Sequence, residues 1–139
     1  MPDPIAPPVA ARPAEAVELV SLAVSGGDLE AALAQYEAGA VLRPWAHDPA
    51  GAGDTVAGAL TVLMDLRLPV SVQIGAVVRA GAIALVLSTR HIRGTGPDCE
   101  PIQLGGAGAT VLRRQQCGSW RIIADAWHLS GRGTGPAHS

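Results

Sequence analysis

A chain of 139 residues is long enough for one hydrophobic core and too short for two ordinary domains. Its 10 basic side chains, all arginine, and 12 acidic ones give a net charge of -2, so the sequence has no basic stripe of the kind that binds nucleic acid. No apolar run approaches the roughly 20 residues that cross a membrane, and no signal-peptide pattern is present. We therefore expect a cytoplasmic protein that binds neither nucleic acid nor membrane.

The two ends of the sequence lack the patterns of regular structure. Residues 1–13 are rich in proline, and residues 131–139 consist mostly of glycine and other small or turn-forming residues. Such segments bury too little apolar surface to order themselves. We expect a flexible proline-rich arm over 1–13, a single domain over 14–130 and a flexible tail over 131–139.

Three helices are predicted in the first half of the chain, because apolar residues recur there at the spacing of one helix face. Gly26 and Gly27 end the first helix, and Asp28 is placed to cap the second with its side chain. Asp54 is placed to cap the third, and Pro69 ends it. The predicted ranges are 14–24, 28–39 and 54–68 for the helices, 40–42 for a short strand, and 43–53 for a loop.

Beyond Pro69 the spacing of the apolar residues changes to the alternation that is typical of strands. Four long strands are predicted, at 70–79, 82–92, 102–116 and 120–129. Short turns separate them, which predicts an antiparallel meander. Helices followed by strands indicate an α+β domain with the helices on one face of a curved sheet.

Asp125 is the only carboxylate inside a predicted strand, and its neighbours over 120–128 are mostly apolar. A carboxylate is costly to bury, so it needs a partner or a chemical task. Arg90 in another predicted strand could hold it as a structural ion pair, or the two could form part of a ligand site. The sequence leaves both interpretations open.

Several short patterns follow one another in the order and spacing of a known family. They are Gly-Gly-Asp at 26–28, Tyr-Glu-Ala-Gly-Ala-Val-Leu at 36–42, Gly-Thr-Gly at 94–96, and Val-Leu-Arg-Arg at 111–114 leading to Trp120. Together they resemble the nuclear transport factor 2-like superfamily, and within it the SnoaL-like and ketosteroid-isomerase-like small-molecule proteins. The resemblance extends over about residues 14–130.

The resemblance implies a cystatin-like α+β fold, in which a curved antiparallel or mixed sheet wraps around three N-terminal helices as a cone-shaped barrel. It also implies a deep apolar cavity at one end and a homodimer formed through the outer face of the sheet. The family includes cyclases, isomerases and epoxide hydrolases as well as proteins that only bind a ligand. The fold by itself therefore leaves the activity open.

Three positions depart from the pattern of a steroid isomerase. The general-base aspartate of that enzyme would fall on Pro44, the tyrosine of its oxyanion hole near Val20, and the oxyanion-hole carboxylic acid on Thr110. Thr110 can still donate a hydrogen bond, although a weaker one than a carboxylic acid gives. Steroid isomerisation by these residues is therefore not expected.

Side chains alternate across a strand, so placing Thr110 and Trp127 in the cavity also places their neighbours. Trp127 brings Asp125 and Ile123 to the inner face. The hairpin between the second and third predicted strands pairs Thr110 with about Ala84. The side chains that this pairing adds to the inner face are those of Val86, Ser88 and Arg90.

The remaining inner positions are predicted from the same alternation. Gly106 and Gly108 would leave room for a bulky ligand beside Thr110, and Ser71 and Gln73 would point inward unless a bulge reverses their strand. The alternation places His91 and His128 on the outer face. The residues expected to contact a ligand are Tyr36, Trp45, His47, Ser88, Gln73, Trp127 and Ile123.

Asp125, Arg90 and Thr110 are the candidate catalytic residues, with Asp125 as general acid or base and the other two stabilising negative charge on a substrate oxygen. The expected function is that of a cofactor-independent SnoaL-like enzyme, a cyclase, isomerase or epoxide hydrolase, acting on an apolar, oxygenated polyketide-like or isoprenoid intermediate. The alternative is a non-catalytic ligand-binding or carrier protein of the same fold. His47 and Asp48 form a second candidate acid–base pair, and no residues have metal-ligand spacing.

Overall fold

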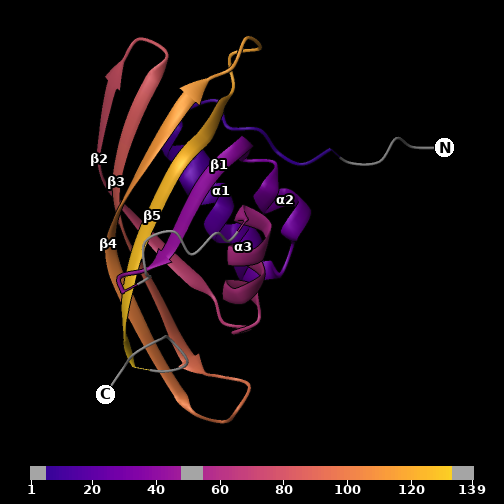
Figure 1. Ribbon diagram of the computed structural model, residues 1–139, viewed down its shortest axis with the longest axis vertical. Helices are drawn as coiled ribbons and strands as arrows, with labels where there is room; N and C mark the ends of the chain where they lie inside the picture. Colours follow the sequence, from indigo (N-terminus) through magenta and orange to yellow (C-terminus); the bar gives the residue numbers. More distant parts are fainter. Residues whose placement is uncertain (1–5, 48–54, 133–139) are drawn as a thin grey trace, which may run out of the picture.

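The computed structural model describes residues 6–47 and 55–132, which form three helices and five strands (Figure 1). The first helix, α1 (Pro13–Gly26), begins with a proline, whose missing N–H would have no partner in the first turn anyway. It ends at Gly27, which adopts the left-handed conformation with φ 69°. The helix predicted over 14–24 is therefore confirmed.

The second helix is shorter than predicted. Asp28 caps α2 (Leu29–Leu33) as expected, by accepting a hydrogen bond from the backbone N–H of Ala31 at 3.1 Å. The helix then ends, and strand β1 (Tyr36–Trp45) takes the place of the predicted helix end, the short strand and the start of the loop. Pairing with a distant strand supplies the hydrogen bonds of β1, and local sequence does not reveal such pairing.

The third helix, α3 (Val56–Met64), is capped by Thr55, whose hydroxyl accepts a hydrogen bond from the backbone N–H of Gly58 at 3.0 Å. The predicted cap, Asp54, lies outside the described residues, as does Asp48. None of the helices in the described part of the chain is long and apolar enough to cross a membrane.

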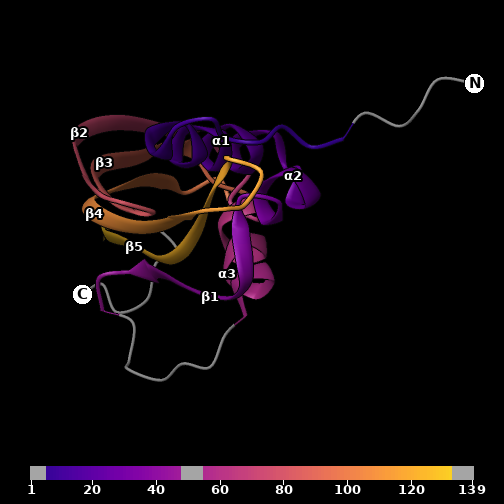
Figure 2. The same ribbon diagram turned by 90° about the horizontal axis from the view of Figure 1, so that it is seen from above.

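Four strands follow α3: β2 (Val70–Ala80), β3 (Ile83–Thr95), β4 (Pro101–Arg114) and β5 (Trp120–Arg132). They confirm the predicted antiparallel meander, and β1 adds to β5 in parallel. The strand order is β1-β5-β4-β3-β2, so this mixed sheet is open and does not close into a barrel. The sheet bends around the helices, which lie on one side of it (Figures 1 and 2).

The hydrophobic core fills the space between the bent sheet and the helices. Valines of α1 and leucines of α3 are buried together with inward side chains of all five strands. Full burial of a side chain of this size contributes roughly 1.5–3 kcal/mol. The largest fully buried apolar side chains are Trp127, Leu60, Leu63, Ile92, Ile102, Leu112, Ile122, Leu129, Val17 and Val20.

A shift in the β2–β3 register reverses the predicted faces of β2. The pairing moves by one residue between Ile74 and Ala76. As a result Ser71 and Gln73 are exposed, while Val72 and Ile74 turn toward the core. The inward placement of Ser71 and Gln73 is therefore wrong, because an inserted residue exchanges the two faces of the strand beyond it.

A second shift lies in the β4–β5 pairing and corrects the placement of Ile123. Val111 pairs with Ala124 and Leu112 with Ile122, so Ile123 is the extra residue on β5. Ile122 is fully buried and Ile123 only partly so. The residue that continues the inner row on β5 is therefore Ile122, and the inward placement of Ile123 is wrong.

The β3–β4 hairpin keeps the predicted faces although its register differs. Thr110 pairs with Val86 and not with Ala84. A difference of two residues leaves every side chain on the same face, because the repeat along a strand is two. Val86, Ser88 and Arg90 are accordingly buried on the inner face.

The prediction that Gly106 and Gly108 leave room for a ligand is wrong. A Cβ added at Gly106 would collide with the backbone carbonyl of His128, and one at Gly108 with the carbonyl of Ala126. The space beside these glycines is therefore filled by the backbone of β5. Glycine is needed here because the two strands approach closely.

Part of the expected proline-rich arm contacts the domain. Ala10 is fully buried and forms an isolated β-bridge with Trp120, whose N–H donates to its carbonyl at 2.9 Å. The side-chain amide of Gln35 donates to the carbonyl of Pro8 at 2.7 Å. The described residues that precede α1 are thus joined to the end of α2 and to the start of β5.

Candidate functional site

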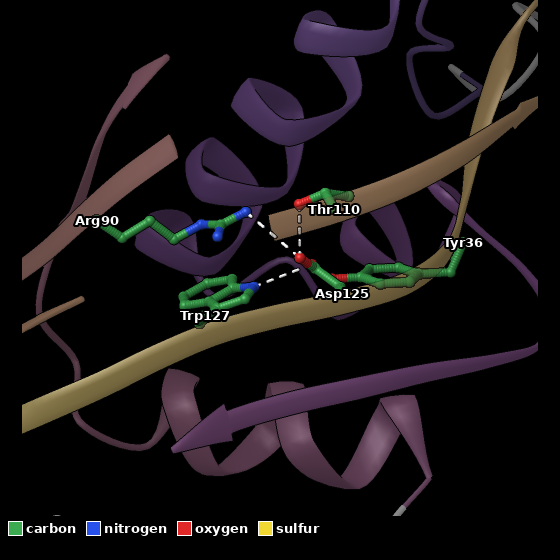
Figure 3. Close-up of polar contacts among 5 residues, drawn as sticks. All are labelled: Tyr36, Arg90, Thr110, Asp125 and Trp127. Carbon is green, nitrogen blue, oxygen red and sulfur yellow. Dashed lines mark hydrogen bonds and ion pairs between the residues drawn. The ribbon is translucent and has the colours of Figure 1, made fainter. Parts of the chain in front are cut away.

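Asp125 lies at the centre of a group of polar side chains between the sheet and the helices (Figure 3). Three of them donate hydrogen bonds to its carboxylate. The hydroxyl of Thr110 donates to Oδ1 at 2.7 Å, and Oδ2 accepts from the hydroxyl of Tyr36 at 2.8 Å and from the indole N–H of Trp127 at 3.0 Å. Asp125 is only 3% exposed. A buried carboxylate needs hydrogen-bond donors in place of water, and these three side chains supply them.

Four strands bring this group together, with Arg90 coming from β3. Asp125 and Trp127 lie two residues apart on β5 and therefore share a face. Thr110 on β4 is the antiparallel partner of Asp125, and on the other side Leu42 of β1 is its parallel partner. Tyr36 lies at the start of β1, and its ring reaches back to Asp125 (Figure 3). We call Tyr36, Arg90, Thr110, Asp125 and Trp127 the buried polar cluster.

Arg90 is the least satisfied member of the buried polar cluster. Its side chain is fully buried, with one terminal nitrogen, Nη2, 3.7 Å from Oδ1 of Asp125 and the guanidinium 4.4 Å from the ring centre of Trp127. None of its three nitrogens has a hydrogen-bond acceptor among the described residues. The hydroxyl of Ser88, two residues earlier on the same face, also has no partner there. Buried donors without acceptors are rare and call for an explanation.

Tyr36 is held as a neutral hydrogen-bond donor. Burial raises its pKa well above the ordinary value, and the negative charge and hydrogen bond of Asp125 raise it further. The nearby positive charge of Arg90 acts in the opposite direction but more weakly. At neutral pH Tyr36 therefore keeps its proton, which lies in the hydrogen bond to Asp125.

The other predicted ligand contacts do not join the cluster. Trp45 is half-buried at the end of β1, where it pairs with Leu129, and His47 is exposed just beyond it. Gln73 is exposed on the outer face and Ile123 is only partly buried. Of the predicted ligand contacts, the structure thus places Tyr36 and Trp127 against Asp125, and Ser88 two residues from Arg90 on the same face of β3.

The histidines in the described part of the chain and both cysteines lie away from the cluster. His91 and His128 are exposed on the outer face, as the alternation predicted, and Cys99 and Cys117 are free and exposed. Within residues 6–47 and 55–132, no three His, Cys, Asp or Glu side chains are grouped closely enough to hold a metal ion.

Two hollows of ligand size lie in the described part of the fold, the first beside Tyr36 and the second on the outer face of the sheet. One, of about 340 Å³, lies between the end of α2, the first half of β1 and the start of α3. The other, of about 510 Å³, lies on the outer sheet face over the middle of β3, β4 and β5. The first hollow is lined by Leu33, Tyr36, Glu37, Ala38, Gly39, Ala40, Thr55 and Val56.

The sequence did not predict the contacts that Tyr36 and Glu37 make with the last two strands and the turn between them. It treated Tyr36 as a core or ligand contact and did not connect it to Asp125. Glu37, beside it, forms an ion pair with Arg113 at 3.1 Å and accepts a hydrogen bond from the side chain of Gln115 at 2.8 Å. The sequence signal for these contacts was the segment 36–42. The direction in which its side chains point follows only from its pairing with β5, which the sequence does not show.

Neither a search of family models nor a search of curated proteins finds a match to this sequence. Solved structures do match. A ketosteroid isomerase-like protein from Erwinia carotovora atroseptica has 19% identity and a TM-score of 0.72, over 86% of this chain and 94% of that one. A nuclear transport factor 2-like protein of unknown function from Pseudomonas putida has 18% identity and a TM-score of 0.59, over 83% and 82%.

A third structure is that of SalBIII, described as an epoxide hydrolase/cyclase-like enzyme in pyran ring formation in the polyether salinomycin. It has 16% identity and a TM-score of 0.54, over 84% of this chain and 89% of that one. Identities this low show a common fold and leave activity and substrate open. On the evidence of its helices, its open mixed sheet and these structures, the chain has the nuclear transport factor 2-like fold.

Proposed function

We propose that the chain is a cofactor-independent small-molecule enzyme, a cyclase, isomerase or epoxide hydrolase, which acts on an apolar, oxygenated polyketide-like or isoprenoid molecule. The observation that carries this proposal is Arg90, a fully buried guanidinium with no hydrogen-bond acceptor in the described part of the chain. A buried donor without an acceptor costs roughly 1–3 kcal/mol. A ligand oxygen that reached Arg90 would supply the acceptor.

The contact between Arg90 and Asp125 argues against a purely structural ion pair. Their closest atoms are 3.7 Å apart, which is too far for a hydrogen bond. The strands that carry the two residues do not need this contact, because each of them is hydrogen-bonded to β4. Asp125 balances the charge of Arg90 without occupying its donors.

Arg90 and Asp125 together suit acid–base chemistry at a ligand oxygen. Arg90 can stabilise negative charge that develops on the oxygen, and burial strengthens that interaction. Asp125 can accept or return a proton. The opening of an epoxide, the closure of an ether ring and the shift of a double bond beside a carbonyl all combine these two steps. That SalBIII shares the fold is consistent with the first two.

The test is turnover of a panel of small hydroxy-epoxides and unsaturated cyclic ketones, followed by mass spectrometry in D2O. We expect the wild-type protein to convert at least one compound or to incorporate deuterium. Asp125→Asn should reduce the rate about 100-fold or more, since loss of a general acid or base has that effect. Arg93→Met, which changes an exposed arginine on β3, the strand of Arg90, is the control. Unchanged turnover in Asp125→Asn would remove Asp125 from the mechanism.

One observation favours a second function, that of a non-catalytic binding or carrier protein. Three hydrogen bonds already occupy most of the acceptor sites of Asp125. A carboxylate so engaged is suited to positioning Arg90 as a fixed ligand contact. Under this alternative, panel compounds bind in calorimetry, binding is lost in Arg90→Met, and no compound is converted.

The proposed partner, besides the small metabolite, is a second copy of the chain docked through the outer sheet face. Val78 is 57% exposed and Leu87 42% exposed on that face, and Ala107 and Ala126 lie between them and the far edge. Exposed apolar surface of this kind marks an interface. Light scattering should give the mass of a dimer for the wild-type protein and of a monomer for Leu87→Glu. A monomeric wild-type protein contradicts this proposal.

A further inference from the structure

We infer that the hollow between α2, β1 and α3 is the ligand site of the proposed enzyme, and that Tyr36 is a catalytic residue that relays a proton between a ligand oxygen there and Asp125. This inference rests on the proposed function and adds the place of the ligand, a second ligand oxygen at Tyr36 besides the one proposed at Arg90, and the path of the proton between Tyr36 and Asp125. The sequence predicted Tyr36 as well as Trp45 and His47 as ligand contacts, and the structure leaves the last two outside the buried polar cluster.

The hollow has the size and lining of a small-molecule site. Its volume of about 340 Å³ lies within the range of roughly 300–1,000 Å³ that is common for such sites. Leu33, Ala38, Ala40 and Val56 give it an apolar wall. An apolar wall with few polar groups suits a compact hydrocarbon skeleton that carries one or two oxygens.

Tyr36 connects this hollow with the buried polar cluster. It is one of the residues that line the hollow, and its hydroxyl donates to Oδ2 of Asp125 at 2.8 Å. A phenol hydroxyl is both donor and acceptor, so while it donates to Asp125 its oxygen can accept from a second group. The close-up shows the tyrosine ring extending from β1 to the carboxylate, on the side away from Arg90 (Figure 3).

The relay removes the difficulty that most acceptor sites of Asp125 are occupied. The O–H bond of a ligand hydroxyl breaks and its proton binds the Tyr36 oxygen, while the proton of Tyr36 moves along the existing hydrogen bond to Asp125 Oδ2. The products are a ligand alkoxide, a neutral tyrosine and a neutral carboxylic acid. The same steps in reverse deliver a proton to an alkoxide formed by ring opening. No hydrogen bond to Asp125 has to leave.

Burial supports this role because it keeps Tyr36 protonated. With its pKa raised, the residue acts as a neutral donor and acceptor and does not become a phenolate at neutral pH. Tyr36 is also the only tyrosine of the chain, so Tyr36→Phe removes the single phenol while keeping the ring that packs in the core.

The place of the ligand is tested by fluorescence titration with two probes, naphthol and naphthalene. Ala40→Met and Ala38→Met extend side chains into the hollow, so both should weaken binding of either probe about 10-fold. Ala82→Met, in the exposed turn between β2 and β3, should leave binding unchanged. If neither probe binds, or if both hollow variants bind as tightly as the wild-type protein, this place for the ligand is wrong.

The role of Tyr36 is tested with the same probes, which differ only in a hydroxyl. Naphthol should bind Tyr36→Phe about 3- to 10-fold more weakly than the wild-type protein, the effect of one hydrogen bond, while naphthalene binds both equally. An unchanged preference for naphthol would show that Tyr36 does not touch the ligand oxygen. For any panel compound that is converted, kcat should fall about 100-fold in Tyr36→Phe, while KM should rise by no more than the 3- to 10-fold loss of binding seen with naphthol.

These outcomes separate the inference from the proposed function. If Tyr36→Phe converts the substrate at the normal rate while Asp125→Asn does not convert it, the relay is overturned and the proposed enzyme function stands. Loss of kcat in both variants supports the relay. Binding of naphthol in the hollow without conversion of any panel compound overturns the relay and favours the carrier.

Discussion

The unequal hydrogen bonding of Arg90 and Asp125 predicts that their removal has unequal effects on stability. Asp125 retains three hydrogen-bond donors when Arg90 is replaced, whereas Arg90 has no other counter-charge among the described residues when Asp125 is replaced. We therefore expect Asp125→Asn to be much more destabilising than Arg90→Met. Methionine is chosen because its unbranched side chain can pack on the ring of Trp127, over which the guanidinium of Arg90 lies.

The magnitudes follow from the burial of both side chains, which are each 0% exposed. Leaving a buried charge without its partner costs about 3–5 kcal/mol, so Asp125→Asn should lower the free energy of unfolding by that amount. Arg90→Met also removes a buried cation with unsatisfied donors, so its net cost should be only about 0–2 kcal/mol. The double variant, Arg90→Met with Asp125→Asn, no longer contains the unpaired buried charge of Arg90. It should therefore be more stable than Asp125→Asn alone.

Urea denaturation followed by tryptophan fluorescence measures all three variants, and Arg93→Met on the surface of β3 is the control, expected within about 0.5 kcal/mol of wild type. An Arg90→Met variant as unstable as Asp125→Asn would refute the reasoning. It would mean that the arginine is a structural tie between strands, and the case for a ligand oxygen at Arg90 would be lost.

Three further predictions concern groups at other depths in the fold. Because folding raises the pKa of Tyr36, only the unfolded chain releases this proton just above the ordinary pKa of about 10. The free energy of unfolding should therefore fall as the pH rises beyond that value. Urea denaturation at about pH 8 and pH 11 should show a smaller fall for Tyr36→Phe than for the wild-type protein. The hydrogen bond to Ser119 lowers the pKa of the exposed Cys117 thiol, so a thiol reagent should modify Cys117 more slowly in Ser119→Ala, and an equal rate contradicts this. Gly108→Ala should cost about 1–3 kcal/mol in urea denaturation because its Cβ meets the backbone of β5, and a neutral effect would show that the strands can separate there.

The sequence predicted well those features that depend on periodicity within one element. The four long strands, the cap at Asp28 and the inner row of β3 were all correct. The hairpin register was wrong by two residues, and the faces survived because the strand repeat is also two.

Features that depend on contacts between distant segments were not predictable in this way. The two register shifts move Gln73 outward and Ile122 inward, and nothing in the alternation of β2 or β5 marks them. Gly106 was interpreted from its size alone, although the nearby backbone of β5 decides its purpose. For the same reason Tyr36 was assigned to a helix, because its pairing partner Ile122 lies in the last strand.

The bond between Tyr36 and Asp125 joins positions 89 residues apart, on the first strand and the last. Closing so long a loop costs chain entropy before any contact repays it, so parallel pairing of β1 with β5 is expected late in folding. A chain still being synthesised cannot have this pairing until β5 exists. The proposed chemistry would therefore appear only in a finished molecule, and a proteolytic cut between the two strands that let β1 separate would abolish it even with every catalytic side chain intact.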